Sequence, residues 1–470
     1  MRAPLGVWYD VSTEKTSLGK SRTASRSSSR PSSRRSARPR ALKKSAGADR
    51  KLRVALIGFG TVGRSVAKIL SHDSGGPLLL THIFNRGIKK KKAGSLPSHI
   101  RWTENIDDIL SSNADVVVEL IGGLEPAGEW VRKALRAGKS VVTANKLLIS
   151  EHGPELLDLA RKMGKRLEFG ASVAGGIPAI IGIQEGLAGD RLYKIAGILK
   201  GTCNFILTKM EKDGTSFDAA LKEAQSLGYA EANPSADVDG MDARAKLLIL
   251  TQAGLRLRVR SEQIPCRSIS SVAAVDFMYA AGLDCTIRQI SVALKETKKG
   301  VRLAAAVQPA LIPSASLMAH AQGSQNIVTA TGEFGGKMIF SGYGAGGDPT
   351  AVAVISDLYA ILRSSGAPAE ALPGAAEVPD LVNGDFTVPH YLRFVVRDRP
   401  GIVASIAAVL SKYEISLDAL LQKPGFPHSA LPFVMTLEAC DSAVLERALA
   451  EIARLDFHVE PPLCLPIFLD

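Results

Sequence analysis

An apolar strand that runs directly into closely spaced glycines constrains the fold of this chain more than any other feature. Residues 54–63 read VALIGFGTVG, and the segment after them repeats apolar residues at helical spacing. Here Gly58 permits a tight turn, Gly60 lets a ligand approach the backbone, and Gly63 lets the helix pack on the strand. Free N–H groups at the helix start would face a pyrophosphate. The predicted dinucleotide contacts are Gly58, Phe59, Gly60, Thr61, Val62 and Gly63.

Strand and helix patterns alternate after this motif. Apolar strands are expected at residues 79–84, 116–120 and 140–143, and Pro126 suits the first turn of a helix between the last two. This alternation predicts an α/β fold of the Rossmann type, with a doubly wound parallel sheet.

The end of the second strand bears on the choice of cofactor. An NAD site usually places a carboxylate there, about twenty residues after the glycines, to bind the ribose hydroxyl. This chain has Asn85 and Arg86 instead, followed by lysines at 89–92. These cations could receive a 2′-phosphate, so NADP is favoured over NAD; the alternative is that the lysine run is only a solvated loop.

A lysine follows the strand at 140–143, at the sheet edge where open parallel sheets bind ligands. Thr143, Ala144, Asn145 and Lys146 are therefore candidate cofactor contacts. Taken alone, Lys146 could also be an ordinary surface lysine.

Residues 228–246, GYAEANPSADVDGMDARAK, place four acidic and two basic residues around a turn-rich entry to a helix. Asp239 is the predicted N-cap, and the helix is expected to run to about Ala253. Asp242 and Lys246 then lie four residues apart on one face. Such a pair supports any helix by roughly 0.2–0.5 kcal/mol, but a cluster of this kind can also hold and reduce a small amino acid.

These segments together resemble the homoserine dehydrogenase family over nearly all of residues 51–470. The resemblance is carried by GFGTVG at Gly58, TANK at Thr143, ASVAGGIP at Ala171, GILKGTCNFIL at Gly197, the 228–246 segment, and GYGAGGDPTA at Gly342. It implies reversible NAD(P)H-dependent reduction of L-aspartate 4-semialdehyde to L-homoserine, in threonine, methionine and isoleucine biosynthesis.

The resemblance also implies roles for individual residues. Lys146 and Lys246 would be the catalytic lysines, with Asp242 assisting Lys246, and Glu231 and Asp237 would hold the substrate amino group. Further expected contacts are Gly201, Thr202 and Asn204 near the substrate and nicotinamide, and Gly346 at the cofactor.

Elementary chemistry supports these roles. Reducing an aldehyde needs hydride from the cofactor, a cation beside the growing alkoxide, and a proton, and one ammonium can serve the last two needs. A second lysine nearby would lower the pKa of both. Carboxylates suit a substrate with a permanent ammonium group.

The sequence departs from the family pattern in two places. Ala232, Asn233 and Pro234 replace a more acidic segment. Members often hold a monovalent cation, Na or K, with a Glu side chain where this chain has Gly170. The remaining ligands would be the backbone carbonyls of Val173, Gly175 and Ile177. Glu168 lies on the same strand face but roughly 7 Å away, so cation dependence is left open.

The C-terminal residues 387–470 form another unit after a linker at 366–386. They read as a strand, a turn at Pro400 and Gly401, a helix, a strand at 433–437, a helix at 443–455 and a final strand near 461–468. This resembles an ACT domain, βαββαβ-like, whose implied ligand is an amino acid such as threonine near Asp398–Ile402. Alternatively, the unit only dimerises the chain.

Residues 1–50 form a basic tail with thirteen Lys or Arg, three acids and eleven Ser. Such a segment cannot bury enough surface to fold and is predicted to be disordered. It lacks the apolar core of a secretory signal, while a transit peptide is conceivable. It could bind nucleic acid nonspecifically, but a dispensable extension is favoured.

The rest is expected to comprise a nucleotide domain at 51–180, completed by about 342–365, and a catalytic and dimerisation domain at 181–341. With 46% apolar residues the chain can bury two or three cores, and no apolar run approaches the roughly 18 residues of a membrane helix. Five scattered cysteines fit a reducing cytoplasm. A homodimer or homotetramer is expected.

Two other functions are compatible with parts of the sequence. A thiolate at Cys203 could make the chain a semialdehyde dehydrogenase that works through a thioester, but no histidine lies in the neighbouring motifs. A dinucleotide- and amino-acid-sensing regulator with a nucleic-acid-binding tail would need neither Lys146 nor Lys246.

Overall fold

The computed structural model describes residues 51–72, 75–88, 96–298, 300–364 and 377–468. The basic tail, the lysines at 89–92 and the first part of the linker lie outside the described residues. Predictions about those segments therefore stay predictions.

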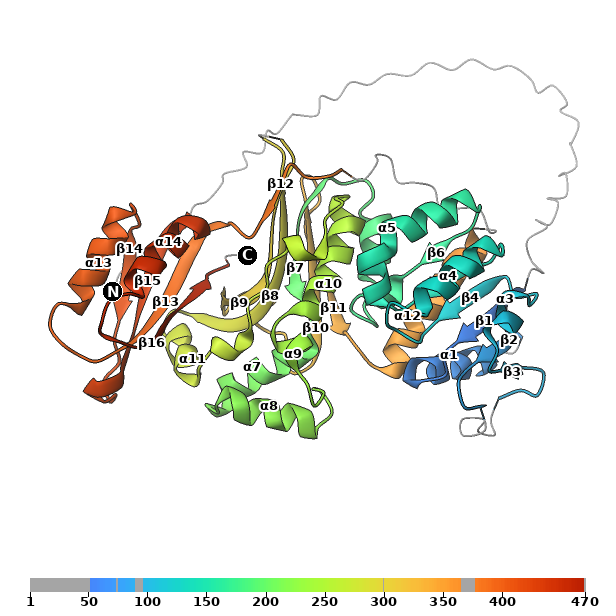
Figure 1. The fold of residues 1–470 in the computed structure, drawn as a ribbon, viewed down its shortest axis with the longest axis horizontal. Coiled ribbons are helices and arrows are strands. Elements are labelled where there is room, and N and C mark those ends of the chain that lie inside the picture. Colours follow the sequence, from blue (N-terminus) through green and yellow to red (C-terminus); the bar gives the residue numbers. More distant parts are fainter. Residues whose placement is uncertain (1–50, 73–74, 89–95, 299, 365–376, 469–470) are drawn as a thin grey trace, which may run out of the picture. The chain divides into compact units, whose positions relative to one another are not determined.

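Six parallel strands form the first sheet, in the order β3-β2-β1-β4-β5-β6 (Figure 1). They are β1 (Leu52–Ile57), β2 (Leu78–Phe84), β3 (Arg101–Thr103), β4 (Val116–Glu119), β5 (Ser140–Thr143) and β6 (Leu167–Glu168). The strand order reverses between β1 and β4, which is the switch point where such sheets bind ligands. The predicted doubly wound sheet is confirmed.

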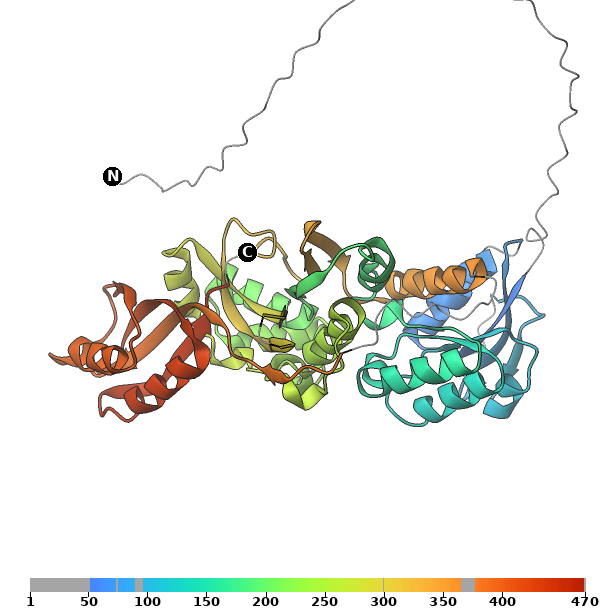
Figure 2. The same ribbon diagram turned by 90° about the horizontal axis from the view of Figure 1, so that it is seen from above.

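Helices cover both faces of this sheet because its strands are apolar on both sides. Val54 and Leu56 point into one cluster with α1 (Thr61–His72) and α12 (Gly347–Arg363). Ala55 and Ile57 point into the other, with α4 (Ala127–Arg136) and α5 (Lys146–Lys162). Figure 2 shows α12 (orange) beside α1 (blue) on one side of the sheet and the green-blue helices on the other. The short helix α3 (Ile106–Leu110) lies between β3 and β4 in the chain.

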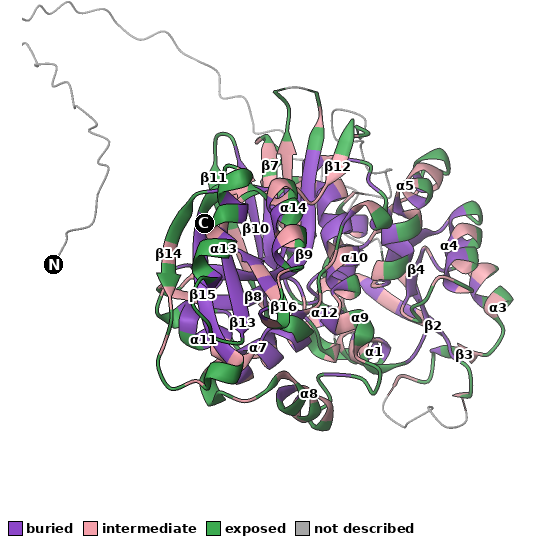
Figure 3. Cartoon of the chain, turned by 60° about the vertical axis from the view of Figure 1, so that its left-hand side comes forward, coloured by how far each residue is buried: buried purple, intermediate pink, exposed green. Residues whose placement is uncertain are grey.

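A second six-stranded sheet has the order β11-β10-β7-β8-β9-β12. Its strands are β7 (Leu192–Ile198), β8 (Cys285–Glu296), β9 (Arg302–Pro313), β10 (Gln325–Gly332), β11 (Gly336–Tyr343) and β12 (Leu381–Asn383). Only the β9–β12 pair of this sheet is parallel. The middles of β8 and β9 are buried (Figure 3), since apolar clusters pack on both faces.

The helices of this part of the chain include the one that carries Asp242 and Lys246. They are α6 (Ala179–Ile181), α7 (Gly201–Asp213), α8 (Phe217–Ser226), α9 (Ser235–Val238), α10 (Met241–Leu250) and α11 (Ala274–Ala281). Single helical turns span Gly170–Ser172, Gly182–Gly186, Thr251–Leu255, Ser261–Gln263 and Ile269–Ser271. No helix of the described residues is long and apolar enough to cross a membrane.

The predicted start of α10 was wrong by one residue. Gly240, not Asp239, is the N-cap, with φ of 86°, and Asp239 instead ends α9. Glycine adopts this left-handed conformation without a steric penalty. At the other end α10 passes into a π-helical turn, Thr251–Leu255, which contains the predicted end at Ala253.

The C-terminal sheet has the order β14-β15-β13-β16 and is antiparallel. In chain order its elements are β13 (Thr387–Val396), α13 (Ile402–Lys412), β14 (Leu417–Leu421), β15 (Leu431–Asp441), α14 (Ser442–Ile452) and β16 (His458–Pro466), with a 3-10 turn at His428–Ala430. The two helices bury one face of the sheet. This is the predicted βαββαβ pattern, although β15 extends beyond the predicted 433–437 and β14 was not located from the sequence.

Candidate active site

The glycine turn after β1 has the geometry that a dinucleotide requires. Gly58 has φ of 107°, and its N–H donates to the Phe84 carbonyl at 2.9 Å. A Cβ on Gly63 would lie 2.3 Å from the Gly58 carbonyl oxygen, so the helix can pack this closely only because residue 63 is glycine. A Cβ on Gly60 would meet nothing within 4 Å, which leaves open space over the backbone.

A cavity of about 320 Å³ adjoins this turn at the carboxyl ends of β1, β2 and β4. Its lining residues are Gly58, Phe84, Asn85, Arg86, Ile121, Gly122, Pro126 and Trp130. Asn85 accepts from the Phe59 N–H at 3.2 Å and donates to the Arg86 carbonyl at 2.6 Å. The Arg86 residue itself is exposed. The buried amide of Asn85 thus fixes the loop, while Arg86 is left accessible to a ligand.

A buried carboxylate that sequence reasoning overlooked connects the loops after β4 and β5. Glu119 is fully buried, and one of its oxygens accepts from the N–H groups of Ile121 and Gly122 at 2.8 and 3.0 Å. The other accepts from the Thr143 hydroxyl at 2.6 Å. Thr143 in turn accepts from the Asn145 N–H at 3.0 Å.

Asn145 completes this network and starts helix α5. Its amide donates to the Gly123 carbonyl at 2.6 Å, and its oxygen caps the helix at the Leu148 N–H at 3.1 Å. Lys146 is the first residue of α5, so the network fixes where the Lys146 backbone lies. Within the apolar run VVVEL, Glu119 gave no signal of this role.

The predicted catalytic residues meet around one carboxylate. Lys146 Nζ lies 2.8 Å from Asp242 Oδ1, and Lys246 Nζ lies 3.0 Å from Asp242 Oδ2. Lys246 also donates to the Leu199 carbonyl at 2.7 Å. The Asp242 side chain is only 8% exposed. Residues from α5 and α10, far apart in the chain, are therefore brought together.

A third lysine, which sequence reasoning missed, joins this cluster. Lys200 Nζ lies 2.5 Å from Asp237 Oδ1 and 3.5 Å from Asp242 Oδ2. It stands between β7 and α7, inside the quoted segment GILKGTCNFIL. We call Lys146, Lys200, Lys246, Asp237 and Asp242 the lysine–carboxylate cluster.

Burial and charge shift the pKa values of the cluster in different directions. Burial alone would raise the pKa of Asp242, but the three ammonium groups outweigh it and hold that pKa well below its usual range. Burial is also the largest influence at Lys246, and it lowers the pKa of the ammonium despite the neighbouring Asp242. The pKa of Lys246 is therefore lowered, in the direction that the sequence predicts. Burial is the main cause of the lowering, and repulsion by the neighbouring lysines is the second.

The other predicted substrate contacts are only partly gathered at the cluster. The Thr202 hydroxyl donates to the Tyr229 carbonyl at 2.6 Å, and Gly201 lies closely against Ser324. The Asn204 amide is fully buried and donates to the carbonyls of Ala321 and Gly323, both at 3.0 Å. Asn204 therefore holds a loop through its amide nitrogen.

Two other predicted contact residues, Glu231 and Gly346, are not part of the lysine–carboxylate cluster. Glu231 is exposed, and among the described residues its carboxylate forms no ion pair with the three lysines. Gly346 has φ of 126° and caps α12. The next residue, Gly347, lies against Thr61 and Ser65 of α1, so the start of α12 adjoins the glycine turn.

The region of the predicted cation site contains a carboxylate from another element. A Cβ on Gly170 would lie 2.7 Å from Asp357 Oδ1 of α12. Burial, together with the charge of Glu168, raises the pKa of Asp357 to about 8. The Ile177 carbonyl already accepts from the Ala179 N–H at 2.7 Å. A group of three or more His, Cys, Asp or Glu side chains suited to a metal is absent from the described ranges.

The Cys203 thiol does not have the properties of a nucleophile. It is fully buried, and its Sγ donates to the Asp237 carbonyl at 3.2 Å. Burial strongly raises the pKa of this thiol, so it stays protonated. The thioester alternative loses its nucleophile.

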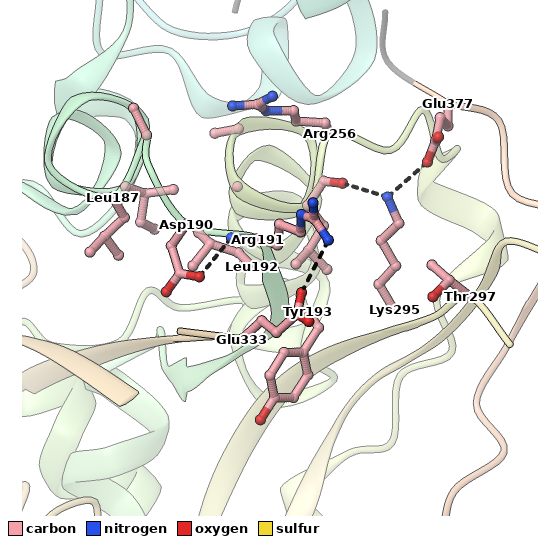
Figure 4. A pocket seen from close by; sticks show the side chains of 15 residues that line it. Leu187, Asp190, Arg191, Leu192, Tyr193, Arg256, Lys295, Thr297, Glu333 and Glu377 are labelled. Carbon is pink, nitrogen blue, oxygen red and sulfur yellow. Dashed lines mark hydrogen bonds and ion pairs between the residues drawn. The ribbon is translucent and has the colours of Figure 1, made fainter. Parts of the chain in front are cut away.

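A wide cavity of about 670 Å³ is lined by residues outside the lysine–carboxylate cluster, and Figure 4 shows its lining side chains. Two pairs of opposite charge lie among its lining residues. Lys295 contacts Glu377 at 2.7 Å, and Arg191 contacts Glu333 at 3.6 Å. None of the predicted site residues lines this cavity.

A doubly wound sheet with this glycine turn, combined with a lysine–carboxylate cluster, defines an oxidoreductase that uses a nicotinamide dinucleotide. Comparison with known families agrees. Family models match the homoserine dehydrogenase NAD-binding domain at residues 58–170, homoserine dehydrogenase at 178–359 and the ACT domain at 390–457. The chain belongs to the homoserine dehydrogenase family.

Individual relatives show how far the similarity extends. Homoserine dehydrogenase of Bacillus subtilis is 36% identical over 412 residues, which cover 84% of this chain and 94% of the relative. The Corynebacterium glutamicum enzyme is 36% identical over 425 residues, covering 86% and 95%. A solved homoserine dehydrogenase from Thiobacillus denitrificans is 34% identical, with a TM-score of 0.81 over 89% of this chain and 98% of that one.

Proposed function

We propose that this chain catalyses the reversible NADPH-dependent reduction of L-aspartate 4-semialdehyde to L-homoserine, a step toward threonine, methionine and isoleucine. One observation carries the proposal: Lys146 and Lys246, from different elements, bind opposite oxygens of the buried Asp242 carboxylate. Family membership supplies the substrate. The alternative of a sensing regulator gains no support from the relatives, which are named as dehydrogenases.

The cluster can perform the proton transfer that accompanies hydride transfer. The bound nicotinamide would supply the hydride to the aldehyde carbon. Lys246, as an ammonium, would stabilise the developing alkoxide and give it a proton. In the oxidative direction the neutral Lys246 amine would take the hydroxyl proton, and its lowered pKa makes that form accessible. Asp242 would hold Lys146 and Lys246 at the reacting oxygen.

Substrate selection would rest on charge. An amino acid aldehyde carries a permanent ammonium, and within the cluster Asp237 offers a carboxylate to bind it. Glu231 would join it only if the exposed loop that bears it closes over the substrate. Thr202 and Gly201, at the start of α7, would border the nicotinamide and substrate.

The preferred cofactor in this proposal is NADP. The exposed Arg86 beside the 320 Å³ cavity can reach a 2′-phosphate, and Asn85 offers no carboxylate for a ribose hydroxyl. A hyperthermophilic archaeal homoserine dehydrogenase that resembles the chain, with 27% identity and a TM-score of 0.57, was solved with NADPH. Replacing Arg86 with Ala should lower kcat/KM for NADPH about tenfold while leaving that for NADH unchanged.

Three further proposals rest on the family alone or on composition. A monovalent cation would be held by the carbonyls of Val173, Gly175 and Ile177, with Asp357 as the nearby carboxylate. The ACT domain would bind threonine near Asp398–Ile402, where Asp398 pairs with His428 at 2.6 Å. The chain would act as a homodimer or homotetramer in the cytoplasm.

The direct test is oxidation of L-homoserine by the purified chain with NADP⁺, followed by the absorbance of NADPH. Formation of NADPH from homoserine but not from L-serine, which is one carbon shorter, supports the proposal. Absence of turnover with homoserine, in a preparation that binds NADPH, contradicts it.

A further inference from the structure

Lys200 is the one member of the lysine–carboxylate cluster for which neither the sequence nor the family resemblance supplied a role. Its side chain is 18% exposed, compared with 41% for Lys146 and 12% for Lys246. The backbone at Lys200 is extended, and the residue is the N-cap of α7. Its neighbour Leu199 accepts a hydrogen bond from Lys246. The Lys200 ammonium contacts both carboxylates of the cluster, and the residue before it binds the Lys246 ammonium.

The charges of the cluster do not balance. Three ammonium groups face two carboxylates, Asp237 and Asp242, which leaves one positive charge in excess. Burial works against the charged form of Lys200, but Asp242 and Asp237 outweigh it and hold its pKa above the usual value. Lys200 is thus a permanent cation at neutral pH, unlike Lys246, whose pKa is lowered.

One charged group of the proposed substrate has no partner so far. The proposed function gives the α-ammonium to Asp237 and the reacting oxygen to Lys246 and Lys146. The α-carboxylate also loses water on entering the site, and a desolvated carboxylate is costly unless a cation binds it. Lys200 has three N–H donors, and its contacts with Asp237 and Asp242 use two of them.

The geometry points to Lys200 as the residue that binds the substrate α-carboxylate, side by side with Asp237, which binds the α-ammonium. The two charged groups of an α-amino acid are attached to the same carbon. Lys200 and Asp237 carry the complementary charges, and these also lie close together, with 2.5 Å between Lys200 Nζ and Asp237 Oδ1. Among the described residues the second oxygen of Asp237 has no polar partner, so it can accept from the substrate without breaking that pair. This inference rests on the proposed function and makes Lys200 a determinant of specificity for α-amino acids.

The test replaces Lys200 with Met, which keeps the apolar length and removes the charge. For homoserine oxidation with NADP⁺, KM should rise at least tenfold while kcat changes less than threefold. Lys200→Arg, which restores the cation, should recover part of the loss. The matched control is Lys209→Met on the same helix, where Lys209 pairs with Asp213 and Glu223 away from the cluster; its KM should equal that of the native chain.

A truncated substrate separates carboxylate binding from a structural role. 3-Aminopropan-1-ol is homoserine without its α-carboxylate, and its inhibition constant should be the same for the native chain and Lys200→Met. A homoserine KM that is unchanged or lower in Lys200→Met overturns the inference, as does an equal weakening of homoserine and the amine. If Lys200→Met fails to bind NADPH, Lys200→Gln takes its place. A native chain that does not oxidise homoserine refutes the proposed function instead.

Discussion

Alanine substitutions at Gly60 and Gly63, beside the turn after β1, should affect stability differently although both weaken cofactor binding. At Gly63 the new Cβ would lie 2.3 Å from the Gly58 carbonyl oxygen, whereas a carbon and a carbonyl oxygen in contact are about 3.3 Å apart. Strand and helix would have to separate by about 1 Å. Overpacking of this kind costs about 1–3 kcal/mol. A misplacement of 1 Å can reduce catalysis about 100-fold.

At Gly60 the new Cβ would meet nothing within 4 Å in the protein itself. Gly60→Ala should therefore change the free energy of unfolding by less than about 0.5 kcal/mol. The methyl group would occupy the space through which the pyrophosphate approaches the backbone. We expect the Kd for NADPH to rise at least about tenfold, equivalent to about 1.4 kcal/mol.

Thermal unfolding without cofactor and fluorescence titration with NADPH distinguish the two effects. Gly63→Ala should lower both the unfolding temperature and the affinity, while Gly60→Ala should lower the affinity alone. Native unfolding behaviour in Gly63→Ala would refute the packing argument. Native NADPH affinity in Gly60→Ala would show that the pyrophosphate does not lie over this glycine.

Two further predictions concern buried carboxylates. The folded-state pKa of Asp357, about 8, lies above its unfolded value, so this group stabilises the fold most at low pH and the contribution is lost as pH rises from about 4 through 8. Asp357→Asn should remove this dependence of stability on pH, and at pH 8.5 it should be more stable than the native chain by a few kcal/mol, since roughly 1.4 kcal/mol accompanies each pH unit. Urea unfolding of both proteins at pH 6 and 8.5 checks this. An equal change of unfolding free energy with pH in the two proteins would contradict it. Asp276, fully buried, accepts from the Tyr391 hydroxyl at 2.7 Å and pairs with Arg393 at 3.3 Å. Asp276→Ala should cost about 3–5 kcal/mol because, among the described residues, the buried Arg393 guanidinium would keep only the exposed Glu460 carboxylate as an ion-pair partner, at 3.7 Å. Tyr391→Phe should cost only about 1.5–3 kcal/mol. The reverse order in urea unfolding would show that the ion pair matters less than the hydroxyl.

Local sequence patterns predict an element of the fold correctly where the residues of that element themselves determine its conformation. The strand at 140–143 matches β5 because three of its four residues, in the sequence SVVT, are β-branched and suit a strand buried on both faces. By contrast β14, Leu417–Leu421, is short and half-exposed, and lacks the alternation that marks a strand. Asp239 was preferred to Gly240 as a cap because the left-handed backbone at Gly240 could not be foreseen.

In the candidate site, too, some contacts follow from local sequence spacing and others depend on the tertiary fold. Asp242 and Lys246 share a helical face, so their contact follows from spacing alone. Lys200 gave no such signal, because only the packing of β7 and α7 against α9 and α10 brings it to Asp237. Asp357 was missed for the same reason, since α12 must fold back before its carboxylate fills the space at Gly170.

The reduction of L-aspartate 4-semialdehyde by NADPH, followed by loss of NADPH absorbance for the native chain and for Lys246→Met, tests the central claim most directly. The native chain should oxidise NADPH, and Lys246→Met should be slower by about 100-fold to 10,000-fold, the range for removing a general acid. NADPH binding by the variant confirms that it is folded. Equal rates for the two proteins would remove Lys246 from the mechanism, and no turnover by the native chain would contradict the proposed function.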